Sequence, residues 1–287
     1  MSSPTPLHEM IPALIKTFAV GHEADSDEHL AQALVYNAGR LAWRLREAGL
    51  QAPEQKTSVS DIVTEADKAA EAFVAGVLEL VRPADGVLGE EGTQRASESG
   101  KTWVIDPVDG TYNFASGSDY FCLGGGIGSA VALVSGSPAD PTEVHFGAVH
   151  RPAMGYTWFG GPNIPSTKDG KPLTPLVDKP LNMVSLGTYI HPSSLTDPKI
   201  FSAWNKVATR VATLRMLGAG SIDLATVADG GLGVWLQHSV ADWDWLPGQA
   251  LVAGVGGLCQ RVAAGGVTWS VAGNRQAATE LIELLQG

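Results

Sequence analysis

The chain has 287 residues, 44% of them hydrophobic, which is enough to bury the core of one large domain or two ordinary ones. Its net charge of −11 and the lack of a Lys/Arg cluster exclude a surface that neutralises nucleic-acid phosphates. The two cysteines, Cys122 and Cys259, stand in apolar surroundings, so we expect small buried thiols in a reducing compartment.

The sequence shows no segment typical of export or membrane insertion. The opening residues, MSSPTPLHEM, lack a basic region followed by an apolar one. The longest uncharged stretch, between Asp119 and Asp140, is rich in glycine, which favours a strand–turn–strand over a membrane helix. We therefore expect a cytoplasmic protein that binds no membrane.

Amphipathic helices are predicted at the start of the chain. Over residues 29–48, leucines recur on one face and Ser26 can cap the first turn. Over residues 66–80, the apolar face runs to Leu80. A shorter helix is expected over residues 10–18.

The middle of the chain indicates strands. Val87–Leu88 and Trp103–Ile105 are short apolar runs that each stop at acidic residues. Residues 121–159 are rich in β-forming residues and glycine, which indicates an antiparallel meander. Scattered Pro and Gly then indicate a boundary between two halves, residues 1–180 and 181–287.

Strands and helices alternate in the second half, which favours an α/β layer. A strand over residues 183–186 and a helix over 200–211 come first. "MLGAGSIDLATVADGG" then places two glycines before an alanine-rich helix, and "GVWLQH" is a strand. "DWDWLPGQALVAGVGG" places acid before another helix with Pro247 in its first turn.

Four acidic segments lie at predicted strand ends or helix starts. Three of them have an ordinary structural explanation when each is taken alone. In "DIVTEAD", Thr64 and Asp67 have the spacing of a capping box, and "GEE" resembles a solvated loop. Either Asp242 or Asp244 can cap the helix that follows.

The fourth segment, "WVIDPVDGT", is harder to explain as a turn, because a buried strand ends directly at Asp106 and Asp109. Two such close carboxylates raise each other's pKa unless a cation lies between them. Mg²⁺ prefers oxygen ligands, and phosphate can complete its shell. Gly110 and Thr111 offer backbone N–H groups to an anion. Because such strand ends collect at one crevice, the four segments together predict a metal-dependent phosphoryl-transfer site.

In their order along the chain, "DIVTEAD", "GEE", "WVIDPVDGTYNF" and "WDWLPGQALVAGVGG" resemble the inositol monophosphatase-like family of metal-dependent phosphatases. "LGAGSIDLATVADGG" and "GNRQAATELIELL" extend the similarity, which covers about residues 56–287. The resemblance implies an α/β/α/β/α sandwich with an N-terminal α+β half that binds metal and a C-terminal α/β half. It also implies inhibition by lithium and, often, a homodimer. Residues 1–55 exceed the family core, and we assign them no function.

The resemblance implies two or three Mg²⁺ ions. The first would be held by Glu90, Asp106 and the carbonyl of Val108. The second would be held by Asp106, Asp109 and Asp244, so that Asp106 bridges the ions.

The resemblance also implies direct attack of water on a small phosphorylated substrate, without a phospho-enzyme. Glu90 and Thr111 would activate the water, and Asp61 would hydrogen-bond into that group. The remaining substrate-binding positions are Asp109, Gly110 and Thr111 at the phosphate and Gly218, Ala219, Gly220 and Gln237 at the alcohol.

Two departures from the inositol-phosphatase branch leave the alcohol open. Gln237 stands where that branch usually has Glu, and Ala219 stands where it commonly has a small hydroxyl residue. Inositol phosphate, histidinol phosphate, fructose bisphosphate and phosphoadenosine phosphate therefore all remain candidate substrates.

Three other protein classes fit less well. A haloacid-dehalogenase-type phosphatase needs Asp-x-Asp-x-Thr, and the spacing here is one residue longer. "GGGIG" and "GAGSID" do not complete a dinucleotide-binding fingerprint. A non-catalytic metal-binding or regulatory homologue would be expected to lose Glu90, Thr111 or Asp244, and all three are present.

Overall fold

The computed structural model describes residues 10–49, 54–58, 61–121 and 130–287, with only the backbone of residues 57, 58, 61 and 62. Its α-helices are α1 (Ile11–His22), α2 (Asp27–Glu47), α3 (Glu65–Val81), α4 (Thr111–Ser116), α5 (Pro198–Ala208), α6 (Gly220–Ala228), α7 (Asp242–Gly254) and α8 (Arg275–Gln286). No helix in these ranges is long and apolar enough to cross a membrane.

Most strands form two sheets. The larger, eight-stranded sheet contains β3 (Gly86–Gly89), β4 (Gln94–Arg95), β5 (Lys101–Asp106), β6 (Ala130–Ser137), β7 (Asp140–Arg151), β8 (Tyr156–Gly161), β9 (Ile164–Lys168) and β10 (Lys171–Pro172). The five-stranded sheet contains β11 (Ser185–Tyr189), β12 (Thr213–Arg215), β13 (Val234–His238), β14 (Leu258–Ala264) and β15 (Val267–Gly273). A separate hairpin pairs β1 (Glu54–Ser58) with β2 (Asp61–Val63).

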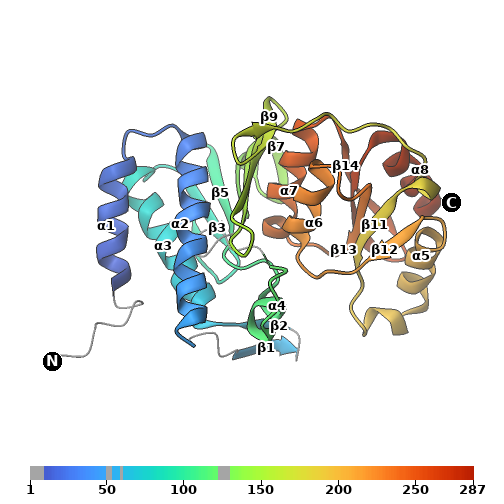
Figure 1. Cartoon of the computed structure of the whole chain (residues 1–287), viewed down its shortest axis with the longest axis horizontal. Coiled ribbons are helices and arrows are strands. Elements are labelled where there is room, and N and C mark those ends of the chain that lie inside the picture. Colours follow the sequence, from blue (N-terminus) through green and yellow to red (C-terminus); the bar gives the residue numbers. More distant parts are fainter. Residues whose placement is uncertain (1–9, 50–53, 59–60, 122–129) are drawn as a thin grey trace.

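The elements stack as α/β/α/β/α layers, as the resemblance implied (Figure 1). α1, α2 and α3 cover the outer face of the eight-stranded sheet, α6 and α7 lie between the sheets, and α5 and α8 cover the outer face of the five-stranded sheet. Each interface is a separate hydrophobic cluster, with Trp103 in the first, Trp235 in the second and Trp269 in the third. The buried area between layers is thus the main source of stability.

The strand pairings agree with the predicted antiparallel meander in the first half and the predicted α/β layer in the second. From β5 through β10, neighbouring strands of the larger sheet are antiparallel and follow one another in sequence order. The meander predicted for residues 121–159 is thus present, although residues 122–129 lie outside the described part. β3 and β5 pair in parallel. In the smaller sheet, β11 pairs in parallel with both β12 and β13. The chain changes sheets between β10 and β11, and a domain division at residue 180 stays a prediction.

Local capping explains how the early helices begin. The hydroxyl of Ser26 accepts a hydrogen bond from the N–H of His29 at 3.3 Å, which caps α2 as predicted. The expected capping box of α3 is present. The prediction for Leu80 was wrong, since this side chain is 54% exposed. The buried stripe of α3 continues through Leu78 to partly buried Val81, which turns Leu80 to solvent.

Helix α7 departs from the sequence prediction at its start. It begins at Asp242 after Ala241, so neither Asp242 nor Asp244 is the N-cap, and Pro247 falls beyond the first turn. α7 packs closely on β7, because a Cβ added to Gly147 would lie 2.1 Å from the carbonyl oxygen of Pro247. Glycine at position 147 therefore lets the backbone of α7 touch the sheet at Pro247.

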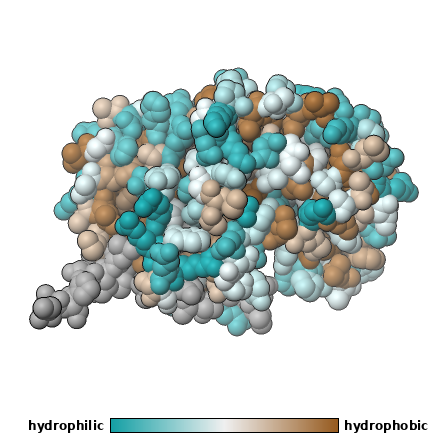
Figure 2. Space-filling view, in the orientation of Figure 1, coloured by the Kyte–Doolittle hydropathy of each residue, from teal (hydrophilic) through white to brown (hydrophobic). Residues whose placement is uncertain are grey.

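Figure 2 shows hydrophilic and hydrophobic residues interspersed over the face seen in Figure 1. The described cysteine, Cys259, is partly buried, and burial raises the pKa of its thiol to about 12. Such a thiol is unreactive, which agrees with the predicted structural role; Cys122 lies outside the described residues.

Candidate active site

The acidic segments meet at the carboxyl ends of β3 and β5. These strands are parallel neighbours, so Glu90, which follows β3, and Asp106, which ends β5, lie at the same edge of the sheet. Asp244 comes from the first turn of α7. Asp106, Asp109 and Asp244 each offer a carboxylate oxygen within 4.8 Å of the others. The structure therefore brings together three predicted metal ligands from two distant parts of the sequence.

Asp106 is the most unusual residue of this cluster. It is 0% exposed, and neither of its carboxylate oxygens accepts a hydrogen bond from an N–H or hydroxyl group of the described residues; the side chain within hydrogen-bond reach is another acid, Asp244. Burial, reinforced by Glu90, Asp109 and Asp244, raises its pKa well above the ordinary value. An unsatisfied buried polar group costs about 1–3 kcal/mol, and a charged one costs more. A hard divalent cation would supply the missing partner and remove the repulsion, so the residues fit a metal ion.

Glu90 flanks the group of three. Burial and the nearby Asp244 raise the pKa of Glu90 to about 8, and Lys56 opposes this shift. The ammonium of Lys56, on β1, lies 3.4 Å from Glu90 and 2.8 Å from Glu91. Lys56 was not a sequence candidate, because nothing in its local pattern shows that the hairpin folds over the "GEE" turn.

Asp109 joins the acidic cluster to the second half of the chain. Its carboxylate accepts hydrogen bonds from the backbone N–H groups of Gly220, at 3.0 Å, and of Ser221, at the start of α6. Burial and Asp244 raise the pKa of Asp109 to about 7, and the Ser221 N–H opposes them. The N-terminal end of a helix favours a carboxylate, so α6 helps to keep Asp109 ionised.

Thr111 meets a partner that the sequence prediction did not assign to it. Its hydroxyl lies within hydrogen-bond distance of the Val108 carbonyl, at 2.9 Å, and of the Asp67 carboxylate, at 3.2 Å. Asp67 also closes the capping box with the N–H of Thr64 at 2.8 Å. Burial raises the pKa of Asp67 to about 7. The side chain of Asp61 lies outside the described residues, so its catalytic role stays a prediction.

Asp67 was missed because the capping box accounted fully for its presence. The available signal was the residue type, since capping boxes favour the longer Glu or Gln at this position. A short carboxylate there can also be reached by a hydroxyl from another loop.

The loop of Gly218 and Ala219 packs directly on the "DGT" turn. Gly110 has a φ of +88°, and a Cβ there would lie 3.0 Å from the Gly218 carbonyl oxygen. Asn113 fastens the same loop, because its amide donates to the carbonyls of Leu217, at 2.8 Å, and of Tyr120, at 2.6 Å. Asn113 was also missed, since its partner at position 217 is 104 residues away.

Gln237 lies at the carboxyl end of β13, opposite Tyr189 on β11 and Ser270 on β15. It is partly buried. Its contact with a substrate alcohol stays a prediction, as do the substrate roles of Gly218, Ala219 and Gly220.

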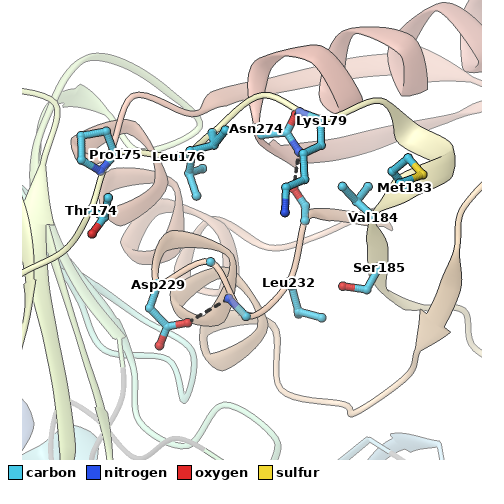
Figure 3. A pocket seen from close by; sticks show the side chains of 14 residues that line it. Thr174, Pro175, Leu176, Lys179, Met183, Val184, Ser185, Asp229, Leu232 and Asn274 are labelled. Atoms are coloured by element: carbon cyan, nitrogen blue, oxygen red, sulfur yellow. Dashed lines mark hydrogen bonds between the residues drawn. The ribbon is translucent and has the colours of Figure 1, made fainter.

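A cavity of about 360 Å³ lies at the other end of α6, between the 174–179 segment, the 229–233 turn and Asn274 (Figure 3). Asp229 in this cavity is already paired, since it accepts hydrogen bonds from Lys168 at 3.0 Å and from the N–H of Gly231 at 3.2 Å. The cavity therefore does not share the unpaired acidic chemistry of the cluster around Asp106.

The layered fold and the buried acidic centre define a metal-dependent hydrolase of phosphate esters. The inositol monophosphatase family model matches residues 24–286, and the chain belongs to this family. It is 31% identical to the probable inositol 1-monophosphatase ImpA of Mycobacterium tuberculosis over 295 aligned positions, which cover 98% of this chain and 94% of that protein. The resemblance found in the sequence is thus confirmed. The expectation that residues 1–55 exceed the family core was wrong for residues 24–55, which the family model includes.

Solved structures support the same conclusion. The crystal structure of extragenic suppressor protein suhB from Bartonella henselae superposes with a TM-score of 0.75 at 21% identity, covering 90% of this chain and 97% of that one. A staphylococcal enzyme, SaIMPase-II with inositol monophosphate bound, gives a TM-score of 0.72 at 25% identity, covering 90% and 94%. The predicted fold class is confirmed, and the chain is a phosphoric monoester hydrolase of a metal-dependent family.

Proposed function

We propose that this enzyme is a Mg²⁺-dependent phosphomonoesterase that hydrolyses a small phosphorylated alcohol by direct attack of water. The observation that carries the proposal is the pair of unpartnered carboxylate oxygens of Asp106, 0% exposed and beside two other aspartates within 4.8 Å. Among the described residues only another acid, Asp244, reaches this group, whereas a bound cation would stabilise it.

We propose that the predicted ligands hold two or three Mg²⁺ ions. Glu90, Asp106 and the Val108 carbonyl would hold one ion, and Asp106, Asp109 and Asp244 a second. When bound, Mg²⁺ supplies positive charge that offsets the phosphate charge and makes water a better nucleophile.

The chain's own residues then orient the water. The Thr111 hydroxyl donates to the carbonyl of Val108 or to Asp67, which leaves an oxygen lone pair to accept a hydrogen bond from water. Asp67, whose pKa is raised to about 7, can take up a proton that passes through this hydroxyl. The N–H groups of Gly110 and Thr111 would bind phosphate oxygens.

Inositol monophosphate is the first substrate to test, because relatives are named for it and SaIMPase-II binds it. Gln237 and Ala219 depart from that branch, so histidinol phosphate, fructose bisphosphate and phosphoadenosine phosphate belong in the same panel. We further propose that the enzyme is a cytoplasmic homodimer inhibited by lithium.

The test is a panel of phosphate esters assayed with Mg²⁺ and with a chelator, while phosphate release is measured. We expect hydrolysis of at least one small ester that disappears on chelation and returns with Mg²⁺. Full activity in the chelated protein would contradict the metal assignment. Mg²⁺ binding without hydrolysis of any ester would instead favour a non-catalytic metal-binding regulatory homologue.

A further inference from the structure

Glu71 is a buried carboxylate that the proposed mechanism does not use. It lies on α3 and is 2% exposed. Its two oxygens accept hydrogen bonds from the backbone N–H groups of Glu91 and Thr93, each at 2.7 Å. Hydrogen bonds to an ionised carboxylate are short and strong, so Glu71 fastens the "GEE" turn to α3.

Gly89 makes this contact possible. A Cβ added at Gly89 would lie 2.4 Å from the carboxylate carbon of Glu71 and 2.4 Å from one of its oxygens. Because real Cβ atoms do not approach so closely, any other residue at position 89 would push the carboxylate away. Gly89 and Glu71 therefore form one unit, in which the Glu71 carboxylate from α3 fills the space that a side chain at position 89 would occupy.

The backbone on both sides of Glu90 is fixed by this unit and by the sheet. The Glu90 N–H donates to the Ile105 carbonyl at 3.2 Å, and the next N–H along the chain donates to Glu71. The Gly89 N–H donates to the Thr93 carbonyl at 2.8 Å, which closes the turn. The backbone of Glu90 thus has little freedom to move away from Asp106, although the repulsion between the two carboxylates favours separation.

We infer that Glu71 is a positioning residue, which sets the affinity of the acidic centre for divalent metal by holding Glu90 in place. The inference rests on the proposed function, because it presumes that Glu90 is a metal ligand. Groups that orient metal ligands typically contribute about 10–100-fold to metal affinity or activity.

The experiment compares Glu71→Gln with Glu79→Gln, an exposed glutamate on the same helix. Gln keeps the shape of Glu71 but presents an N–H group to one of the two N–H donors. We expect Glu71→Gln to weaken Mg²⁺ binding about 10–100-fold by calorimetry, with faster hydrogen exchange at the amides of Glu91 and Thr93. Excess Mg²⁺ should restore kcat and leave KM unchanged. A merely structural defect would instead lower the fraction of folded protein and leave the Mg²⁺ affinity of the folded molecules as in the wild type. Glu79→Gln should behave as the wild type.

A double-variant cycle guards against a simple folding defect. Gly89→Ala should weaken Mg²⁺ binding because its methyl group displaces the Glu71 carboxylate. Adding Glu71→Ala to Gly89→Ala should cost little more, since both changes break the same contact.

The outcomes separate the inference from the proposed function. If the wild type binds Mg²⁺ and Glu71→Gln binds it equally well, only the inference is overturned. If the wild type itself has no affinity for Mg²⁺, the proposed function falls and the inference falls with it, while amide exchange still reports the contact between Glu71 and the turn.

Discussion

The two ends of the β3–β5 strand pair each carry a buried aspartate, and the two are treated differently. At the amino end, Asp85 accepts hydrogen bonds from Trp103 at 2.8 Å and from Ser99 at 2.6 Å. At the carboxyl end, Asp106 accepts no hydrogen bond from an N–H or hydroxyl group within the described part of the chain. Both are nearly inaccessible, at 6% and 0% exposed.

The contrast shows that this fold can satisfy a buried carboxylate with ordinary donors. It does so where the carboxylate has a structural role. At the carboxyl end of the same strands, further carboxylates surround Asp106 instead. Their repulsion lowers the free energy of unfolding unless a cation binds. Within one sheet, the buried carboxylate of Asp85 therefore has a structural role, whereas that of Asp106 has a functional one. Each of the following experiments tests one part of this difference.

The largest effect is expected for Asp106→Asn. It should remove phosphatase activity to background, a loss of about 10³-fold or more, because the charge stabilisation that metal ions supply is worth several kcal/mol. Mg²⁺ binding should be lost in the same variant. Asp85→Asn is the matched control and should keep Mg²⁺ affinity and kcat. Equal losses of Mg²⁺ affinity and kcat in the two variants would show that the two ends of the strands do not differ in function.

A second experiment separates chemistry from metal binding at the carboxyl end. Thr111→Ala should lower kcat about 10²–10⁴-fold, the usual effect of losing a positioned acid–base partner, and leave Mg²⁺ affinity nearly unchanged. Thr111→Ser keeps the hydroxyl and should retain most of the activity. Wild-type turnover in the alanine variant would refute the role of the Thr111 hydroxyl.

A third experiment follows the stability of the metal-free protein against pH. Folding raises the pKa of Glu90 to about 8 and of Asp109 to about 7, from ordinary values of 4.5 and 3.8. The folded state then binds protons more tightly than the unfolded state, so this contribution is complete below about pH 4 and is lost as the pH rises towards 8. We expect the melting temperature to fall over this range, and excess Mg²⁺ to reverse the fall.

The same melts compare the two aspartates. At pH 8 without metal, Asp106→Asn should raise the melting temperature by roughly 5 °C, since the amide replaces a buried ionisable group that repels Glu90, Asp109 and Asp244. Asp85→Asn should lower it, because it breaks hydrogen bonds to Trp103 and Ser99. Destabilisation by both substitutions would mean that the carboxylate cluster carries no strain.

The smallest effect is expected at the alcohol side, away from both aspartates. Gln237 is neutral and both donates and accepts hydrogen bonds, whereas Glu would accept from polyol hydroxyls with a full charge. Gln237→Glu should shift the ratio of kcat/KM values several-fold, about 1 kcal/mol, towards inositol monophosphate and away from the best alternative ester. An unchanged ratio would place Gln237 outside the alcohol pocket.

Much of this architecture follows from local sequence patterns. The apolar face of α2, the Ser26 cap and the capping box at Thr64 predicted helices close to their observed bounds. The acidic strand ends and helix starts predicted that the four acidic segments would meet at one crevice, and the resemblance implied Asp106, Asp109 and Asp244 as ligands; these three residues do lie together.

The parts that could not be predicted depend on contacts across the chain. Glu71 looks like an ordinary charged residue of an amphipathic helix until Gly89 is seen to leave space for it. Lys56 approaches Glu90 only because the β1–β2 hairpin folds over that turn. The start of α7 was misplaced because two acidic residues near a helix start look alike in sequence, and backbone geometry decides between them.

The bonds from Asp109 to the start of α6 also bear on how the molecule folds. They join residues 111 and 112 positions apart, so this contact closes a long loop of chain. The antiparallel succession from β5 to β10 joins near neighbours and can form early, whereas contacts of such long range form late. The complete set of carboxylates therefore exists only after both halves have docked. An ion that binds this set stabilises finished molecules over partly folded ones, which makes metal availability a control on the yield of folded protein.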